Sequence, residues 1–272
     1  MMDAVVTATL ILRERPGGTS QTRFVCFDDG FSRLVKWNWS SDDASFHGAH
    51  SCYNELVASR IAQLLRAPVL PGAIVNVGRD TAFEDPSEAS PLRPGLHFGA
   101  DRLAGRDFKT RERIECYATV DELASAAVFL GWLKIADIAT SVKGSEATQD
   151  GGVFLRSIVD ASGHRALRYV LVDLEGAFKG AKWNRDTFNE QMLNEEQLLP
   201  PHMKGLEQAQ LDPHLQALLH LDEAAIRGCF ASYPEEWSVT QAERLAAEDW
   251  TIQRARLLGK CGRKTPRSIS VA

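Results

Sequence analysis

Cysteine is scarce in this sequence of 272 residues, and the few cysteines present form no pattern. They are odd in number and widely scattered: Cys26, Cys52, Cys116, Cys229 and Cys261. No two have the spacing of a metal-binding pair, and an odd number does not suit a disulfide framework. We interpret them as reduced thiols and expect neither disulfides nor a metal to stabilise the fold.

Long apolar runs and an excess of basic charge are also missing. No apolar run reaches the roughly 20 residues that span a membrane, and the N-terminus lacks the pattern of a secretory signal. We expect a cytoplasmic protein without membrane association. The net charge of −5 and the pI of about 5.8 argue against general nucleic-acid binding. Walker-A spacing, zinc motifs, a nucleophile elbow and a Rossmann fingerprint are absent.

Residues 4–37 have the pattern of a small antiparallel sheet with a glycine-rich turn. β-formers fill 4–12, and apolar runs at 24–27 and 34–37 flank an Asp-Asp-Gly turn signal. Adjacent glycines let the backbone approach a ligand, and their N–H groups can donate to phosphate oxygens beside neighbouring hydroxyls. The turn contains Gly17, Gly18, Thr19 and Ser20. We predict that it binds phosphate together with Lys36; the alternative is an ordinary hairpin with a surface lysine.

A helix is predicted over 51–65, because apolar residues recur there at helical spacing until an Arg-Ala-Pro stop. Glu55 lies in its first turn, close to the apolar face, so its carboxylate can turn inward. The alternative is a solvated acid favoured by the helix dipole. Farther along, 73–77 has the composition of a strand, and 96–100 is interpreted as an edge strand or a hinge between two lobes.

The clearest helix starts at Thr119, which forms a capping-box pattern with Glu122. The apolar run from Leu123 to Leu133 predicts that this helix is buried. It leads into Asp137 and then into a polar loop over 138–152.

A second hairpin, with strands at 153–159 and 167–172, leads directly into Asp173. After it, helical patterns separated by prolines occupy 186–199, 212–220, 222–232 and 239–258. Ser238 begins a capping-box pattern for the last of these. The basic tail after residue 258 is predicted to lack structure.

The order of these parts suits phosphoryl transfer. Backbone donors cover the phosphates, and a lysine aligned by a glutamate binds their oxygens. One aspartate then orients or deprotonates the acceptor hydroxyl, and another holds a metal ion.

On these residues the sequence resembles the HipA-like kinases, bacterial relatives of the protein-kinase-like fold close to the phosphatidylinositol-kinase branch. The matching segments, within about 5–235, are 15–20 (Arg-Pro-Gly-Gly-Thr-Ser), Val35-Lys36-Trp37, 54–60 (Asn-Glu-Leu-Val-Ala-Ser-Arg), 95–99 (Gly-Leu-His-Phe-Gly), Trp132-Leu133 and Val172-Asp173 with Ala177-Phe178.

The resemblance implies a role for each candidate residue of the first 100 positions. Gly17, Gly18, Thr19 and Ser20 would form the nucleotide-phosphate loop. Lys36 would contact the ATP phosphates and pair with Glu55. The segment around His97 and Phe98 would be the hinge near the adenine, contributing mainly backbone contacts.

Two aspartates complete the site that the resemblance implies. Asp137 would be the catalytic aspartate, because Trp132 precedes it by the spacing seen in the family, and Asp173 would hold Mg²⁺. Glu175 is either a second acidic metal ligand or a surface acid.

One departure affects the loop after Asp137. The family usually has an arginine directly after this aspartate and a metal-binding asparagine a few residues later, but 138–160 contains no asparagine. Ser141 or Glu146 would have to serve as the oxygen ligand, with Lys143 offsetting phosphate charge. The alternative is a pseudokinase that binds nucleotide without efficient transfer.

We therefore expect an α+β, two-lobed protein-kinase-like fold. The divisions would be an N-terminal lobe (1–100) with an antiparallel sheet and one helix, a mainly helical C-terminal lobe (101–258) and a disordered tail (259–272). The expected activity is ATP- and Mg²⁺-dependent phosphorylation of a protein Ser or Thr hydroxyl, with a small-molecule hydroxyl as a second option. A pseudokinase with a regulatory partner is the alternative function, transfer of AMP a third, and an antitoxin-like partner follows from family analogy alone.

Overall fold

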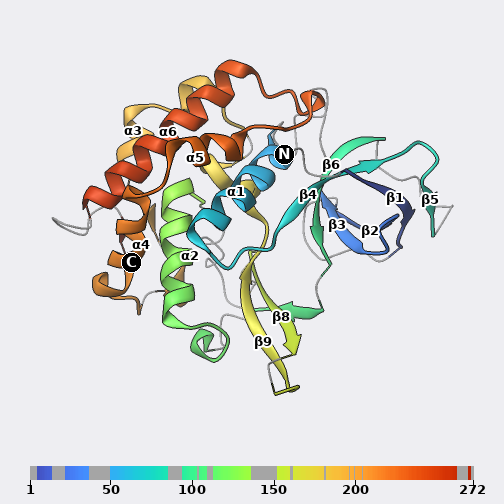
Figure 1. Ribbon diagram of the computed structural model, residues 1–272, viewed down its shortest axis with the longest axis horizontal. Coiled ribbons are helices and arrows are strands. Elements are labelled where there is room, and N and C mark those ends of the chain that lie inside the picture. The colour runs from blue at the N-terminus through green and yellow to red at the C-terminus, as the bar shows by residue number, and fades with distance from the viewer. Residues whose placement is uncertain are drawn as a thin grey trace, which may run out of the picture.

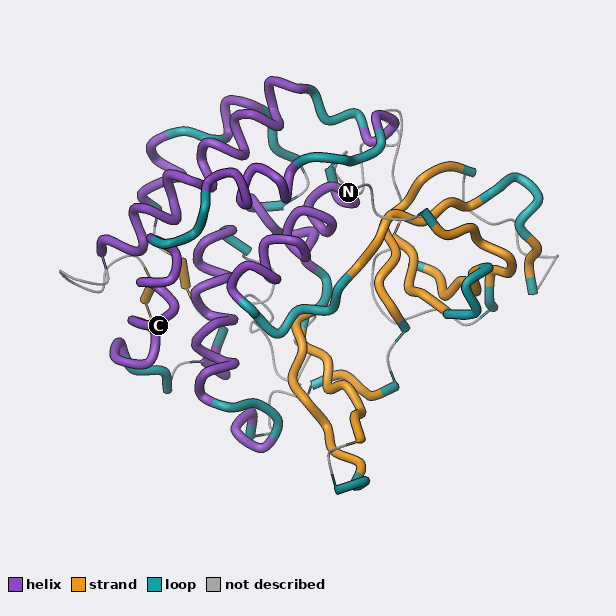
Figure 2. The backbone as a smooth tube through the Cα atoms, viewed as in Figure 1, coloured by secondary structure: helices purple, strands orange, loops and turns teal. Residues whose placement is uncertain are grey.

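The computed structural model describes residues 5–13, 22–36, 50–84, 94–102, 104–108, 113–135, 152–159, 162–180, 182–195, 197–198, 200–203, 205–261 and 269–270. Strands gather on one side of the molecule and helices on the other (Figures 1 and 2). No helix in these ranges is long and apolar enough to cross a membrane.

The strand-rich side is a six-stranded sheet made from the first part of the chain. Its strands are β1 (Val6–Ile11), β2 (Arg23–Phe27), β3 (Ser32–Lys36), β4 (Gly72–Val77), β5 (Ala82–Phe83) and β6 (Gly95–Asp101). They lie in the order β2-β3-β6-β4-β1-β5, and β1 also pairs with β2, so five strands close on themselves. The pairing is mostly antiparallel, but β1 runs parallel to β4 and β5.

The prediction that 96–100 is an edge strand is wrong for β6. This segment was expected to be an edge strand or a hinge, but it lies between β3 and β4 and pairs with both. Its short apolar sequence suits a central strand equally well, because only the long-range pairing decides the position of a strand in a sheet.

Helix α1 (Ser51–Leu65) lies between the sheet and the helices (Figure 1) and has the predicted bounds. Nearly all of its residues are buried, because it is covered from several sides. The chain leaves the helix through Arg66, whose left-handed backbone (φ 53°) lets its N–H bond to the last turn. Pro68 follows, as expected for a helix stop.

The α-helices of the helical side, within the described ranges, are α2 (Val120–Leu133), α3 (Glu190–Asn194), α4 (Gln208–Leu219), α5 (Glu223–Phe230) and α6 (Gln241–Cys261). The predicted capping box of α2 is present, since Glu122 N–H donates to Thr119 Oγ1 at 3.1 Å and Thr119 N–H donates back to Glu122 at 2.7 Å. Eleven residues of α2 are buried, from Leu123 to Leu133, as predicted.

A smaller sheet joins the two sides. It consists of β7 (Gly105–Asp107), β8 (Val153–Val159) and β9 (Arg165–Leu171), in that order and antiparallel. The hairpin β8–β9 projects from the body of the molecule (Figure 1). Directly after β9 comes η4, an irregular 3₁₀ segment over Leu174–Lys179.

Two helix predictions need correction. The helix expected over 186–199 is a 3₁₀ turn (Arg185–Thr187), α3 and a short strand, β10 (Gln197–Leu198), because Asn184 and Asn189 each cap a separate turn. The cap of α6 is Thr240, which exchanges hydrogen bonds with Glu243, and not Ser238.

The predicted structureless tail also differs where the structure describes it. Helix α6 continues to Cys261, and β11 (Ile269–Ser270) pairs in parallel with β10. Only long-range pairing reveals a two-residue strand, so its local sequence gave no signal.

Two hydrophobic cores stabilise the protein. The smaller core lies within the sheet and consists of Ala8, Ile11, Val25, Phe27, Val35, Val75 and Val77. The larger core includes most of α1 together with α2, α4, α5 and α6, and it takes only Ile74 and Phe98 from the buried residues of the large sheet. Helix α1 therefore packs mainly with the helical side.

Candidate functional site

Lys36 and Glu55 meet at the junction between the large sheet and α1. Lys36 is the last residue of β3 and is 7% exposed, and Glu55, one turn into α1, is 3% exposed. Their side chains form an ion pair with a distance of 2.5 Å between Nζ and Oε1. Burial excludes both alternatives from the sequence, the surface lysine and the solvated acid.

Two further carboxylates come from the segment after β9. Lys36 Nζ also contacts Asp173 Oδ1, and it lies 3.4 Å from Glu175 Oε2. Glu175 in turn accepts a hydrogen bond of 2.9 Å from Ser51 Oγ on α1. One oxygen from each of Glu55, Asp173 and Glu175 lies within 4.8 Å of the others, so the three carboxylates surround one ammonium group.

This crowding changes the protonation equilibria of the pair. Burial acts to lower the pKa of Lys36, but the charges of Glu55, Asp173 and Glu175 outweigh it and raise that pKa well above its ordinary value. Burial raises the pKa of Glu55 to about 7, since Asp173 adds to the effect and only Lys36 opposes it. The lysine therefore stays charged, while Glu55 exchanges its proton near neutral pH.

The raised pKa of Glu55 predicts a pH-dependent stability. Between its ordinary value of 4.5 and about 7, the unfolded chain releases this proton while the folded chain keeps it. Raising the pH through this window therefore favours unfolding, by up to about 3 kcal/mol. In urea titrations from pH 4.5 to 7.5, wild type should lose stability relative to Glu55→Gln as the pH rises. Glu115→Gln, at an exposed position, is the matched control, and parallel profiles for wild type and Glu55→Gln would contradict the shift.

The predicted hinge residues lie in β6, next to Lys36. Phe98 is directly opposite Lys36 in the pairing of β3 with β6, and His97 and Phe98 are each 2% exposed. The Phe98 ring lies so close to Gly72 that a Cβ at Gly72 would fall 2.1 Å from it. The Phe98 side chain therefore belongs to the core, and β6 of the large sheet ends at Asp101, before β7 of the smaller sheet begins at Gly105. Adenine contacts by this segment stay a prediction.

The other predicted site residues fall outside the described ranges. These are Gly17, Gly18, Thr19 and Ser20, between β1 and β2, and Asp137, which follows the last described residue after α2, Ile135. The structure therefore brings together Lys36, Glu55 and Asp173 from the predicted set.

Comparison with solved structures identifies the fold of the chain. The chain is similar to the Helicobacter pylori proinflammatory kinase CtkA, with a TM-score of 0.55 over 93% of this chain and 94% of CtkA, at 10% sequence identity. This chain has a two-lobed protein-kinase-like fold. Two structures of the Golgi casein kinase, one with Mn/ADP bound, match at a TM-score of 0.47 and 10% identity; they cover 97% and 98% of this chain and 76% of theirs. No protein-family model and no curated protein sequence matches the chain.

The kinase-like fold confirms the expected α+β architecture. The large sheet and the helical side are its two lobes, and the Lys36 cluster lies where they meet. Its three carboxylates come from α1 and from the segment after β9, which are far apart in sequence.

Sequence reasoning gave no role to Asn54, although it lies beside Glu55. Asn54 is fully buried, and its side chain bonds to three carbonyls of the segment after Asp173. A signal was present, because Ser51, Asn54 and Glu55 recur at i, i+3 and i+4 on one face of a helix that is otherwise largely apolar.

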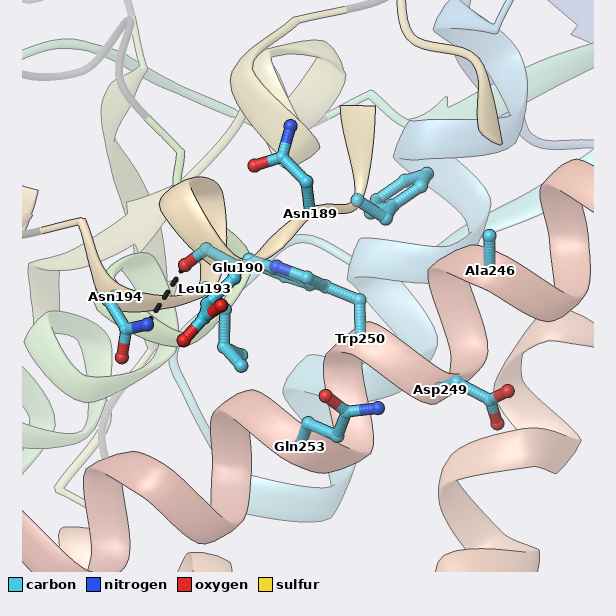
Figure 3. Close-up of a pocket in the computed structure, with 9 residues that line it drawn as sticks. Asn189, Glu190, Leu193, Asn194, Ala246, Asp249, Trp250 and Gln253 are labelled. Atoms are coloured by element: carbon cyan, nitrogen blue, oxygen red, sulfur yellow. Dashed lines mark hydrogen bonds between the residues drawn. The ribbon is translucent and has the colours of Figure 1, made fainter. Parts of the chain in front are cut away.

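A pocket of about 550 Å³ lies elsewhere, on the helical lobe (Figure 3). It is lined by α3, α6 and the residues just before α3, with Trp250 and Gln253 on the α6 side and Asn189 and Glu190 on the other. None of the residues in the Lys36 cluster lines it. The Lys36 cluster combines buried charge with carboxylate ligands, whereas the two carboxylates that line the pocket, Glu190 and Asp249, are exposed.

Proposed function

We propose that this chain is an ATP- and Mg²⁺-dependent phosphotransferase of the HipA-like type that phosphorylates a protein Ser or Thr hydroxyl. The observation that carries the proposal is the buried Lys36, held by Glu55 from α1 and by Asp173 from the segment after β9. Burying these charges carries a desolvation cost, and buried clusters of titratable groups with shifted pKa values concentrate at functional sites.

Each described residue has a task in this proposal. Lys36 binds ATP phosphate oxygens, and Glu55 keeps its ammonium group oriented. Asp173 and Glu175 fit Mg²⁺, since carboxylate oxygens are its preferred protein ligands. When bound, the metal neutralises the charge that develops on the transferred phosphoryl group. By resemblance, Asp137 orients the acceptor hydroxyl, and the Gly17 turn covers the phosphates.

The altered loop after Asp137 supports a second candidate, a nucleotide-binding pseudokinase that acts through a regulatory partner. The absence of asparagine from 138–160 removes the side chain that the family usually places near the metal. Both the phosphotransferase and the pseudokinase would bind nucleotide, but only the phosphotransferase would turn ATP over.

The test is ADP release together with the intact mass of purified protein incubated with ATP, with Mg²⁺ or with EDTA. A phosphotransferase releases ADP only with Mg²⁺ and gains one phosphate or passes it to an added protein acceptor. A gain of AMP mass would indicate the third option, nucleotide transfer.

Lys36→Met separates binding from turnover. Without the ammonium group, ATP affinity should fall by about tenfold or more, because one charge-assisted contact to phosphate is worth about 1.5–3 kcal/mol. Lys260→Met, near the exposed end of α6, is the matched control. Loss of binding in Lys36→Met, with no turnover in wild type, would favour the pseudokinase.

A further inference from the structure

Asn54 connects α1 to the segment that carries Asp173 and Glu175. Its Nδ2 donates to the backbone carbonyls of Glu175, Ala177 and Gly180 at 2.9, 3.0 and 3.1 Å. Its Oδ1 accepts a hydrogen bond of 2.8 Å from Trp183 Nε1.

The orientation of this amide follows from its partners. The three carbonyls can only accept hydrogen bonds and the indole N–H can only donate, so exchanging Nδ2 and Oδ1 would break every contact. The side chain is fully buried, so water cannot replace a lost partner without entering the core. All three bonds from Nδ2 go to carbonyls of one short segment, 175–180.

The backbone of segment 173–180 adopts conformations that are unfavourable without surrounding contacts. Asp173, Phe178 and Lys179 have positive φ values of 61°, 59° and 68°, although none of them is glycine. Such conformations persist where surrounding contacts determine them, and they are frequent at functional sites. The Asn54 bonds provide partners for carbonyls in a stretch that is neither a regular helix nor a strand.

We propose that Asn54 is a positioning residue, which fastens segment 173–180 to α1 and so sets where Asp173 and Glu175 lie relative to the Lys36–Glu55 pair. The inference rests on the proposed function and deepens it. Because Asn54 precedes Glu55 on the same helix turn, its bonds to the backbone of 175–180 tie the segment that carries Asp173 and Glu175 to the helix that carries Glu55. Asp173 and Glu175 would then already be in place to hold a divalent cation with its nucleotide.

The experiment compares Asn54→Ala with Leu56→Ala, a fully buried position of the same helix that lies about 200° around the helix axis from Asn54. Binding of Mn²⁺ in the presence of ADP is followed by electron paramagnetic resonance, and thermal melting reports stability. Asn54→Ala should weaken Mn²⁺·ADP binding by about tenfold or more, as outer-shell partners of metal ligands do. It should also speed hydrogen exchange at the Lys179 and Gly180 amides. Leu56→Ala should lose stability but bind Mn²⁺·ADP as wild type does.

The outcomes separate this inference from the proposed function. Near wild-type affinity in Asn54→Ala, or equal weakening in Leu56→Ala, would overturn the positioning role whatever the turnover. Wild type that binds Mn²⁺·ADP but transfers no phosphate would refute phosphotransfer alone, and weakened binding in Asn54→Ala would still support the inference. If Asn54→Ala does not fold, Asn54→Ser, which keeps one donor, takes its place with the same two criteria.

Discussion

Asp173→Asn is expected to reduce Mg²⁺-dependent ATP turnover by about 10³-fold or more, which corresponds to about 4 kcal/mol of transition-state stabilisation. The carboxylate contacts Lys36 and lies within 4.8 Å of the oxygens of Glu55 and Glu175. Asparagine removes the negative charge that a divalent cation requires. It also tolerates the left-handed backbone at this position (φ 61°) better than alanine, so the fold should be retained.

The measurement is steady-state ADP release over a range of Mg²⁺ concentrations. Asp80→Asn, in an exposed turn of the sheet lobe, is the control and should behave as wild type. Lys36 keeps Glu55 and Glu175 as partners in Asp173→Asn, so metal-free nucleotide binding should survive. Unchanged turnover in this variant would remove Asp173 from the metal site and with it the proposed arrangement.

Trp132→Ala is expected to lower the free energy of unfolding by about 3–5 kcal/mol, the usual cost of removing a large buried ring. Trp132 lies on α2, is fully buried, and donates from Nε1 to the Thr251 carbonyl of α6 at 2.8 Å. The substitution leaves a cavity between the two helices and removes this bond. A loss of this size is a large part of the 5–15 kcal/mol that usually stabilises a domain.

Urea unfolding followed by tryptophan fluorescence measures this effect. Val120→Ala, at a half-exposed position of the same helix, should change the free energy of unfolding by less than about 1 kcal/mol. A small effect of Trp132→Ala would mean that α2 and α6 repack around the missing ring. In the sequence, Trp132 was notable for its spacing to Asp137. In the structure, it packs in the core near the C-terminal end of α2.

Local signals in the sequence predicted much of the fold. Thr119 with Glu122 marked the start of α2, an Arg-Ala-Pro stop marked the end of α1, and turn residues marked the hairpins. These features depend on neighbours within a few residues, so a sequence reports them directly. The expectation of a kinase-like fold came from the resemblance to the HipA-like kinases, and not from these local signals alone.

The pairing of strands that are far apart in the chain could not be predicted from the sequence. Position 96–100 had no local feature that makes it central in the sheet, and β11 was missed for the same reason. At the site, the order of Lys36, Glu55 and Asp173 indicated that they meet, but the contacts of Glu175 and Asn54 depend on a segment more than 100 residues away. Only the folded chain brings these groups together.

The division into two cores has a consequence for motion. Helix α1 belongs to the larger core with the helices, and Arg60 reinforces this by donating to the carbonyls of Cys229 and Ala231 at 3.3 and 2.6 Å. The closed sheet has a core of its own. If the lobes rock against each other, the natural boundary therefore runs between β3 and α1, and the Lys36–Glu55 ion pair spans it. Lys36 would then move with the sheet, while Glu55, Asp173 and Glu175 stay together on the other side of the boundary. The Lys36–Glu55 ion pair would form only when the two lobes are close together.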